Sequence, residues 1–163
     1  MRFRHELQYD APLTRVFAML ADPAFREAVA EAMDVISADV HLERDGDGFT
    51  LTVDQLQKTD DLPGFARTFA GDSTQAIQHE VWLGATGGDL TIEAPGKPTS
   101  MAGTIRLEPA GAGTTEVVEL EIKVKVPLIG GKLEKLMAEK VKAGMDTEQQ
   151  VGRTWLLNHS GGN

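Results

Sequence analysis

Three titratable side chains lie among apolar neighbours, which makes them the first candidates for chemistry. Glu148 falls in the stretch 129–157, where Ile, Leu, Val and Met recur at helical spacing. Burying an unpaired carboxylate costs several kcal/mol, so such a position needs a reason. Glu148 is either a polar anchor for a ligand hydroxyl or amine at a cavity wall, or a hydrated group paired with Lys140 or Arg153.

His5 and His79 are the other two candidates. Each alternates with apolar residues in a strand-like stretch, so each is predicted to point inward. An inward histidine is either a proton donor or acceptor inside a cavity, or a core residue with a satisfied ring.

Two glycines flank Glu148 at intervals of four residues. Gly144 and Gly152 therefore share its helix face, although Gly in a helix interior costs about 1 kcal/mol relative to Ala. Two gaps around one acid predict a helix that lines a cavity, with Met137, Met145 and Trp155 as further wall residues. The two methionines are most simply core residues, and their flexible side chains would also suit an adaptable pocket wall.

Other kinds of site find little support in the sequence. There is no Cys, which excludes disulfides and thiolate chemistry. No cluster of His and carboxylates has metal-ligand spacing, no glycine-rich loop resembles a phosphate cradle, and no Gly-x-Ser-x-Gly motif is present. We therefore expect neither a metal nor another cofactor.

The charge of the chain restricts its partners. The formal net charge of −9 disfavours binding to nucleic acid or to an anionic membrane surface. No apolar run has the roughly 20 residues of a membrane span, and no signal peptide is visible. A cytoplasmic protein without stable membrane insertion is expected, and the sequence does not set its oligomeric state.

The elements that must position these residues follow from the apolar periodicity. A strand over 3–9 precedes two short helices that begin near Pro12 and Pro23, with Asp10 and Asp22 as caps. About six strands with hairpin turns follow, one turn at Gly87-Gly88, before the long helix. The segment 60–72 breaks the strand pattern and is either a helical turn or a mobile flap.

This order predicts an α+β fold, a curved antiparallel sheet of about seven strands covered by one long C-terminal helix. We expect residues 1–158 to form a single domain, from length and pattern, and residues 159–163 to form a loose tail.

The order of elements and the residues at its joints resemble the START-like (SRPBCC) superfamily of polyketide cyclase/dehydrase and lipid-transport proteins. The resemblance lies in the sequence 7–17, in the Asp-Pro corner within 20–26, and in Gly130-Gly131 before the long helix. It implies a helix-grip fold with a cavity for apolar small molecules between sheet and helix. It transfers no catalytic residue, because the superfamily has no shared one.

Three functions compete. The first is a carrier or sensor that binds a lipid or other hydrophobic molecule at Glu148, Gly144, Gly152, Met145, Met137, His79, His5 and Trp155. The second is a cyclase or dehydratase that uses His79, His5 and Glu148 as acid and base. The third is a co-chaperone-like interaction module with a solid interior. Convergence of the three titratable groups on one cavity would favour the enzyme, and their dispersal the binder.

Overall fold

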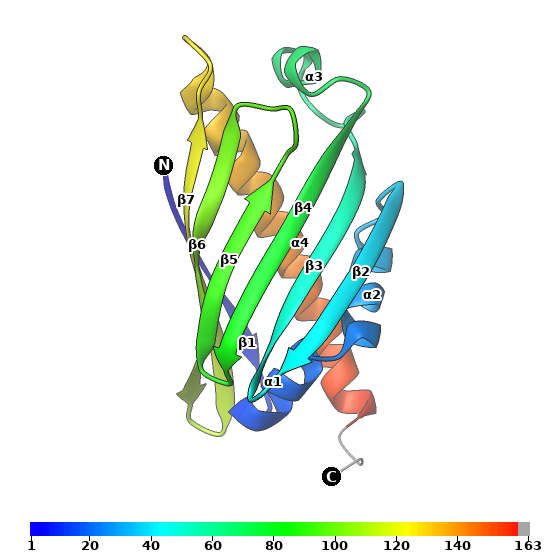
Figure 1. The fold of residues 1–163 in the computed structure, drawn as a ribbon, viewed down its shortest axis with the longest axis vertical. Helices are drawn as coiled ribbons and strands as arrows, with labels where there is room; N and C mark the ends of the chain where they lie inside the picture. Colours follow the sequence, from blue (N-terminus) through cyan, green and yellow to red (C-terminus); the bar gives the residue numbers. More distant parts are fainter. Residues whose placement is uncertain (160–163) are drawn as a thin grey trace.

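A computed structural model describes residues 1–159 of the 163-residue chain. In that part of the chain, a seven-stranded antiparallel sheet wraps around one long helix (Figure 1). None of its helices is long and apolar enough to cross a membrane. The elements, in chain order, are β1 (Arg2–Tyr9), α1 (Leu13–Leu20), α2 (Pro23–Ala32), β2 (Ser37–Asp45), β3 (Gly48–Lys58), α3 (Gly64–Ala70), β4 (Ser73–Gly84), β5 (Gly87–Glu93), β6 (Thr99–Ala110), β7 (Gly113–Val124) and α4 (Gly130–Asn158).

The sheet has the strand order β1-β7-β6-β5-β4-β3-β2. From β2 to β7 each strand pairs with its neighbour in sequence, whereas β1 pairs with β7 along its whole length, from Arg2 opposite Glu121 to Tyr9 opposite Thr114. This long-range pairing places the first and last strands of the sequence, β1 and β7, side by side at one edge of the sheet. Strand β2 forms the other edge. The predicted α+β helix-grip fold is confirmed.

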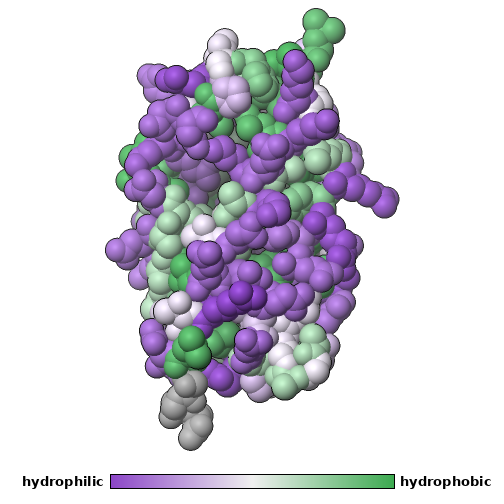
Figure 2. All heavy atoms as spheres, turned by 180° about the vertical axis from the view of Figure 1, so that it is seen from behind, coloured by the Kyte–Doolittle hydropathy of each residue, from purple (hydrophilic) through white to green (hydrophobic). Residues whose placement is uncertain are grey.

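The long helix α4 covers the concave face of the sheet, and in Figure 1 it crosses behind the strands. Its predicted extent, 129–157, agrees with Gly130–Asn158. The face seen from behind is mostly hydrophilic (Figure 2), as expected for a helix that turns its apolar side to the sheet.

The two short helices join at a capped corner. The Asp22 carboxylate accepts a hydrogen bond of 2.9 Å from the Ala24 N–H, and Pro23 takes the first helical position. The start of α1 differs from the prediction, because Pro12 is its N-cap and no side chain caps it. The β4–β5 turn also differs, since Ala85 and Thr86 form it and Gly87-Gly88 begins β5.

Aromatic side chains fill the concave face near α1. The rings of Phe49 and Trp82 stack with centroids 5.5 Å apart, and Phe17 from α1 packs edge-on to Trp82 at 5.9 Å. At the opposite end of the sheet, the segment predicted as a helical turn or flap forms α3, which buries only Ala66. The interior is thus packed near α1 and open toward α3.

Candidate ligand-binding site

A cavity of about 680 Å³ lies between the concave face of the sheet and α4. On α4 its wall runs from Leu133 to Glu148, and strands β3 to β7 form the opposite wall. The C-terminal end of α2 and the segment containing α3 complete it. The expected cavity is present, but it lies along the first two thirds of α4 rather than from Met137 to Trp155.

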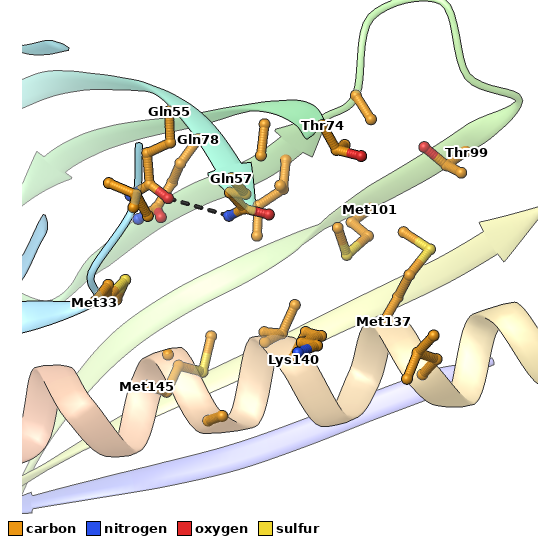
Figure 3. Close-up of a pocket in the computed structure, with 18 of the residues that line it drawn as sticks. Met33, Gln55, Gln57, Thr74, Gln78, Thr99, Met101, Met137, Lys140 and Met145 are labelled. Atoms are coloured by element: carbon orange, nitrogen blue, oxygen red, sulfur yellow. Dashed lines mark hydrogen bonds between the residues drawn. The ribbon is translucent and has the colours of Figure 1, made fainter. Parts of the chain in front are cut away.

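The walls of the cavity are mainly apolar and rich in methionine. Figure 3 shows Met137 and Met145 extending from α4 toward the sheet, with Met101 and Met33 facing the same space. Flexible thioether chains adapt to ligands of different shape. The sheet contributes a polar strip of glutamines, in which Gln57 Nε2 donates to Gln55 Oε1 at 3.1 Å (Figure 3).

Exposed charged residues surround the opening of the cavity, and we call them the rim: Asp34, Lys58, Asp60, Asp61 and Lys140. Two ion pairs cross it. Lys58 Nζ lies 3.1 Å from Asp34 Oδ2, and Lys140 pairs with Asp61. Solvent screens such pairs, so they shape the opening more than they stabilise the fold.

Buried carboxyl groups line the opposite, inner part of the cavity, and we call Glu80, Glu116 and Glu148 the floor. Arg26, from α2, lies beside them with 3% of its surface exposed. Its Nη2 is 2.9 Å from Glu80 Oε1, its Nη1 is 3.2 Å from Glu80 Oε2, and its Nε donates to the Leu20 carbonyl at 2.8 Å. Burial disfavours the guanidinium charge, but the carboxylates outweigh it and raise the pKa of Arg26.

The Glu80 carboxylate is fully satisfied. Besides the two bonds from Arg26, it accepts one from Gln78 Nε2 at 2.6 Å and one from Trp82 Nε1 at 2.8 Å. Four donors around two oxygens explain how a charge can stay buried in this position.

Glu148 shares the same guanidinium less closely. Its Oε1 lies 3.4 Å from Arg26 Nη1, and the residue is 9% exposed. Burial raises the pKa of Glu148 to about 7, against the opposing charge of Arg26. The ion-pair partner is Arg26, not the Lys140 or Arg153 considered from the sequence.

Two polar atoms near the floor have no hydrogen-bond partner within residues 1–159, namely Glu116 Oε1 and the Tyr9 hydroxyl. Glu116 is 1% exposed and Tyr9 2%. Burial, followed by the charge of Glu148, raises the pKa of Glu116 well above its usual range. Burial and the charge of Glu116 also raise the pKa of Tyr9. The floor can therefore hold protons at neutral pH and offers unused hydrogen-bonding capacity to a ligand.

Four of the predicted site residues line this cavity: Glu148, Gly144, Met145 and Met137. A Cβ built on Gly144 would meet only the flexible end of Met33, with Cε at 3.4 Å. The glycine thus leaves room on the cavity side of α4.

Gly152 has a different role from the predicted one. A Cβ at this position would lie 2.6 Å from Tyr9 Cε1 and 3.2 Å from Met19 Cε. The glycine allows the Tyr9 ring to pack against α4, and it does not line the cavity. The periodicity of α4 could not distinguish a gap for a ligand from a gap for an aromatic side chain.

The two histidines do not converge on the cavity. His79 lies on the outer face of β4, exposed, with its Nδ1 3.0 Å from Thr52 Oγ1. His5 bonds through Nε2 to Asp146 Oδ1 at 2.9 Å, beside the wall of α4. The predicted orientation of β4 is wrong because Trp82 and Glu80 occupy its inner face, where Arg26 makes burial of the carboxylate possible.

Trp155 also lies away from the cavity. Its ring packs edge-on against Phe25 at 5.6 Å and stacks on His159 at 4.1 Å. His159, placed in the predicted tail, is therefore in contact with α4, whereas the rest of that tail, 160–163, lies outside the described residues.

Sequence reasoning missed Arg26, Glu80, Glu116 and Tyr9, although signals were present for most of them. Arg26 stands three and four residues before the buried Val29 and Ala30. Glu116 has the same strand parity as Val118, and Glu80 the same parity as Trp82. When charged residues on several elements each share a face with buried apolar residues, they indicate a buried cluster of charged groups.

Comparison with known proteins agrees with this architecture. An uncharacterised protein of Mycobacterium tuberculosis is 28% identical over 122 residues, which are 70% of this chain and 70% of that protein. One structural neighbour is the di-domain ARO/CYC StfQ of the steffimycin biosynthetic pathway, with a TM-score of 0.65 and 14% identity over 98% of this chain and 51% of that one. Another is norcoclaurine synthase from Thalictrum flavum, with a TM-score of 0.63 and 15% identity over 98% of this chain and 87% of the enzyme.

At such low identity the structural neighbours show the fold alone, which is the helix-grip fold that the resemblance to the START-like superfamily implied. The sequence profile of one family extends over residues 4–156, from the first strand into the last turns of α4. Because the match extends over almost the whole chain, the chain belongs to the family described as Protein of unknown function (DUF2505).

Proposed function

We propose that this protein binds a hydrophobic small molecule in the cavity between the sheet and α4, as a carrier or sensor. The observation that carries the proposal is the cavity itself, about 680 Å³ with mainly apolar walls. Ligand sites in proteins commonly have volumes of roughly 300–1,000 Å³ and a few polar groups among apolar ones. We further propose that the protein works in the cytoplasm, which its cysteine-free sequence supports.

The dispersal of His79 and His5 away from the cavity supports binding over the three-residue acid–base mechanism considered from the sequence. The open interior equally disfavours an interaction module with a solid core.

A second candidate is an enzyme in which Glu148 alone transfers the proton. It is favoured by one observation, the pKa of about 7 for a carboxyl that lines an apolar cavity, because such a pKa suits a general acid or base at neutral pH. The neighbours named as an ARO/CYC protein and as norcoclaurine synthase are compatible with it. In that case Glu148→Gln would retain ligand binding and stop turnover of the ligand.

The binding proposal is tested by titration with the neutral fluorescent probe N-phenyl-1-naphthylamine. Its emission should rise on binding, and dodecanol should displace it. Gly144→Leu should abolish this signal without unfolding the protein, because the new side chain enters the cavity.

Gly131→Leu is the matched control. Gly131 lies on the same helix, exposed and with no atom within 4 Å of its ideal Cβ, and it does not line the cavity. It should bind the probe like the wild type. Absence of any probe signal in the wild type, or an equal signal in Gly144→Leu, would refute binding in this cavity. If the probe binds as expected, native mass spectrometry of freshly purified protein should identify a retained ligand.

A further inference from the structure

The floor of the cavity contains more negative groups than positive ones. Glu80, Glu116 and Glu148 face a single guanidinium, that of Arg26, within the described chain. The hydroxyl of Tyr9, from β1, adds a further polar group but no positive charge. With every carboxyl ionised, this set would lack two positive charges in a setting that water screens poorly.

Arg26 makes no hydrogen bond to Glu116, the third carboxyl. Its Nε is bonded to the Leu20 carbonyl, and Nη1 and Nη2 are directed at Glu80 and Glu148. Glu116 enters from β7, on the opposite wall from α2, and its Oε1 is left without a hydrogen-bond partner in the described residues. A buried acceptor without a donor is costly, so a donor supplied from outside would be bound favourably.

The cavity leads from the exposed rim to Glu116 and Glu148, between methionine-rich walls. Glu148 is 9% exposed there and Glu116 only 1%, so the Glu116 carboxyl must turn toward the cavity to contact a ligand. We propose that the ligand of this cavity is an amphipathic amine, whose hydrophobic body lies along Met137, Met145 and Met101 and whose ammonium group binds the floor at Glu116 and Glu148. This inference rests on the proposed binding function and names the class of ligand.

An ammonium group fits the floor better than a neutral hydroxyl. Removing an ammonium from water is costly, but a charge-assisted bond to a carboxylate is roughly twice as strong as a neutral one. Three carboxyl groups beside one guanidinium can supply the negative charge that a buried ammonium group needs. A carboxylate ligand would instead add a fourth negative group and should be rejected.

Protons and the ammonium group compete for the same place. Without ligand, the raised pKa values of Glu116 and Glu148 keep the floor partly protonated at neutral pH. An ammonium that binds there displaces protons, so amine binding should release protons and weaken as the pH falls below about 7. Alcohol binding should do neither.

The test compares dodecylamine, dodecanol and dodecanoic acid as competitors of N-phenyl-1-naphthylamine. The three share one chain and differ in the head group. Dodecylamine should bind about tenfold or more tightly than dodecanol at pH 8, and dodecanoic acid more weakly than either. Glu116→Gln keeps the shape of the side chain and should remove the preference for the amine while dodecanol affinity stays within about twofold.

Calorimetry in two buffers of different ionisation enthalpy provides a measurement on the wild type alone, should the variant not fold. Proton release with dodecylamine and none with dodecanol supports the inference. Equal affinity of amine and alcohol with no proton release would overturn it. In that outcome dodecanol still displaces the probe and the proposed binding function stands. If neither compound nor the probe binds, the binding function fails.

Discussion

At the scale of single residues, the structure is dominated by charges in places where charge is costly. Arg26 and Glu80 are 3% and 1% exposed, yet every oxygen of Glu80 is bonded. Glu148 and Glu116 are less well served, and their raised pKa values express that difference. The negative charges of the floor are therefore only partly balanced by hydrogen-bond donors and by Arg26. The three glutamates should respond differently to mutation and to pH for this reason.

Glu148→Gln should stabilise the protein at pH 8 and have little effect at pH 4. The folded-state pKa of about 7 lies above the ordinary value of 4.5, so this group stabilises the fold when protonated and loses that contribution as the pH rises through 7. We expect a gain on the order of 2 kcal/mol at pH 8, several degrees in Tm. Thermal melts at both pH values measure it.

Asp146→Asn, two positions earlier on α4, is the control with the opposite sign. The hydrogen bond from Lys142, with that of His5, lowers the pKa of Asp146. The ionised Asp146 carboxylate therefore stabilises the folded state above its ordinary pKa, and this stabilisation is lost in acid. The Asp146→Asn variant should be less stable than the wild type at pH 8. A Glu148→Gln variant that is destabilised at pH 8 would contradict the raised pKa.

Arg26→Met should be strongly destabilising. It leaves Glu80 buried without its main partner, and breaking a buried pair in this way costs about 3–5 kcal/mol. The double variant Arg26→Met with Glu80→Met should recover part of the loss, since no uncompensated charge at position 80 remains. Urea unfolding measures both. A single variant within about 0.5 kcal/mol of wild type would show that the pair is not structural.

The two glycines of α4 should behave oppositely when changed to alanine. Gly152→Ala places Cβ 2.6 Å from the Tyr9 ring and should cost about 1–3 kcal/mol through overpacking. Gly144→Ala meets only the flexible Met33 and should gain up to about 1 kcal/mol of helix stability. Chemical denaturation distinguishes them, and a stabilised Gly152→Ala would refute the packing role of this glycine.

At the scale of elements, α4 performs two tasks on one face. Up to Glu148 it forms a cavity wall, and from Gly152 onward it packs against Tyr9, Met19 and Phe25. The helix α3 contributes to the wall at the end of the cavity away from α1. It is seven residues long, buries one side chain, and is tied down by Thr59 Oγ1 donating to the Gly71 carbonyl and Lys97 Nζ donating to the Phe69 carbonyl.

We expect the amides of α3 to exchange with deuterium much faster than those of α4 between 133 and 156. Few buried apolar contacts hold α3, so it opens locally at low free-energy cost. Because Ala66 and Phe69 line the cavity, a bound probe should slow this exchange. Hydrogen-exchange mass spectrometry with and without N-phenyl-1-naphthylamine measures both effects. Protection of α3 equal to that of α4 in the free protein would exclude a gating role for it.

At the scale of the whole molecule, a net charge of −9 surrounds a mainly apolar cavity. Hydrophilic side chains cover most of the face over α4 (Figure 2). Such a molecule repels polyanions at a distance.

Duplex DNA should therefore not bind, even at low salt, where electrostatic attraction is strongest. Binding is measured by the fluorescence anisotropy of a labelled duplex at an ionic strength of about 10 mM, where the Debye length is roughly 30 Å. A salt-sensitive rise in anisotropy would reveal a basic patch that the overall charge conceals. A basic duplex-binding domain under the same conditions serves as the positive control.

The class of fold and the extent of the long helix could be predicted from local sequence patterns. Alternating strands, the Asp22-Pro23 corner and the apolar stripe of α4 are local patterns, and each follows from the 2.0 or 3.6 residue period of its element. The same periodicity placed Glu148 and Gly144 on the inner face of α4, and both line the cavity.

Which groups meet at the floor depends on the packing of elements that are distant in sequence. Arg26, Glu80, Glu116 and Glu148 come from α2, β4, β7 and α4, and no local pattern records their approach. A strand such as β4, with apolar residues on both faces, has an orientation that depends on its partners. Here the ion pair with Arg26 allows Glu80 to face inward. Adjacent residues of a strand point to opposite faces, so His79 faces outward when Glu80 and Trp82 face inward. Burial of charge is a property of the assembled set, which is why the sequence located the cavity wall but not its floor.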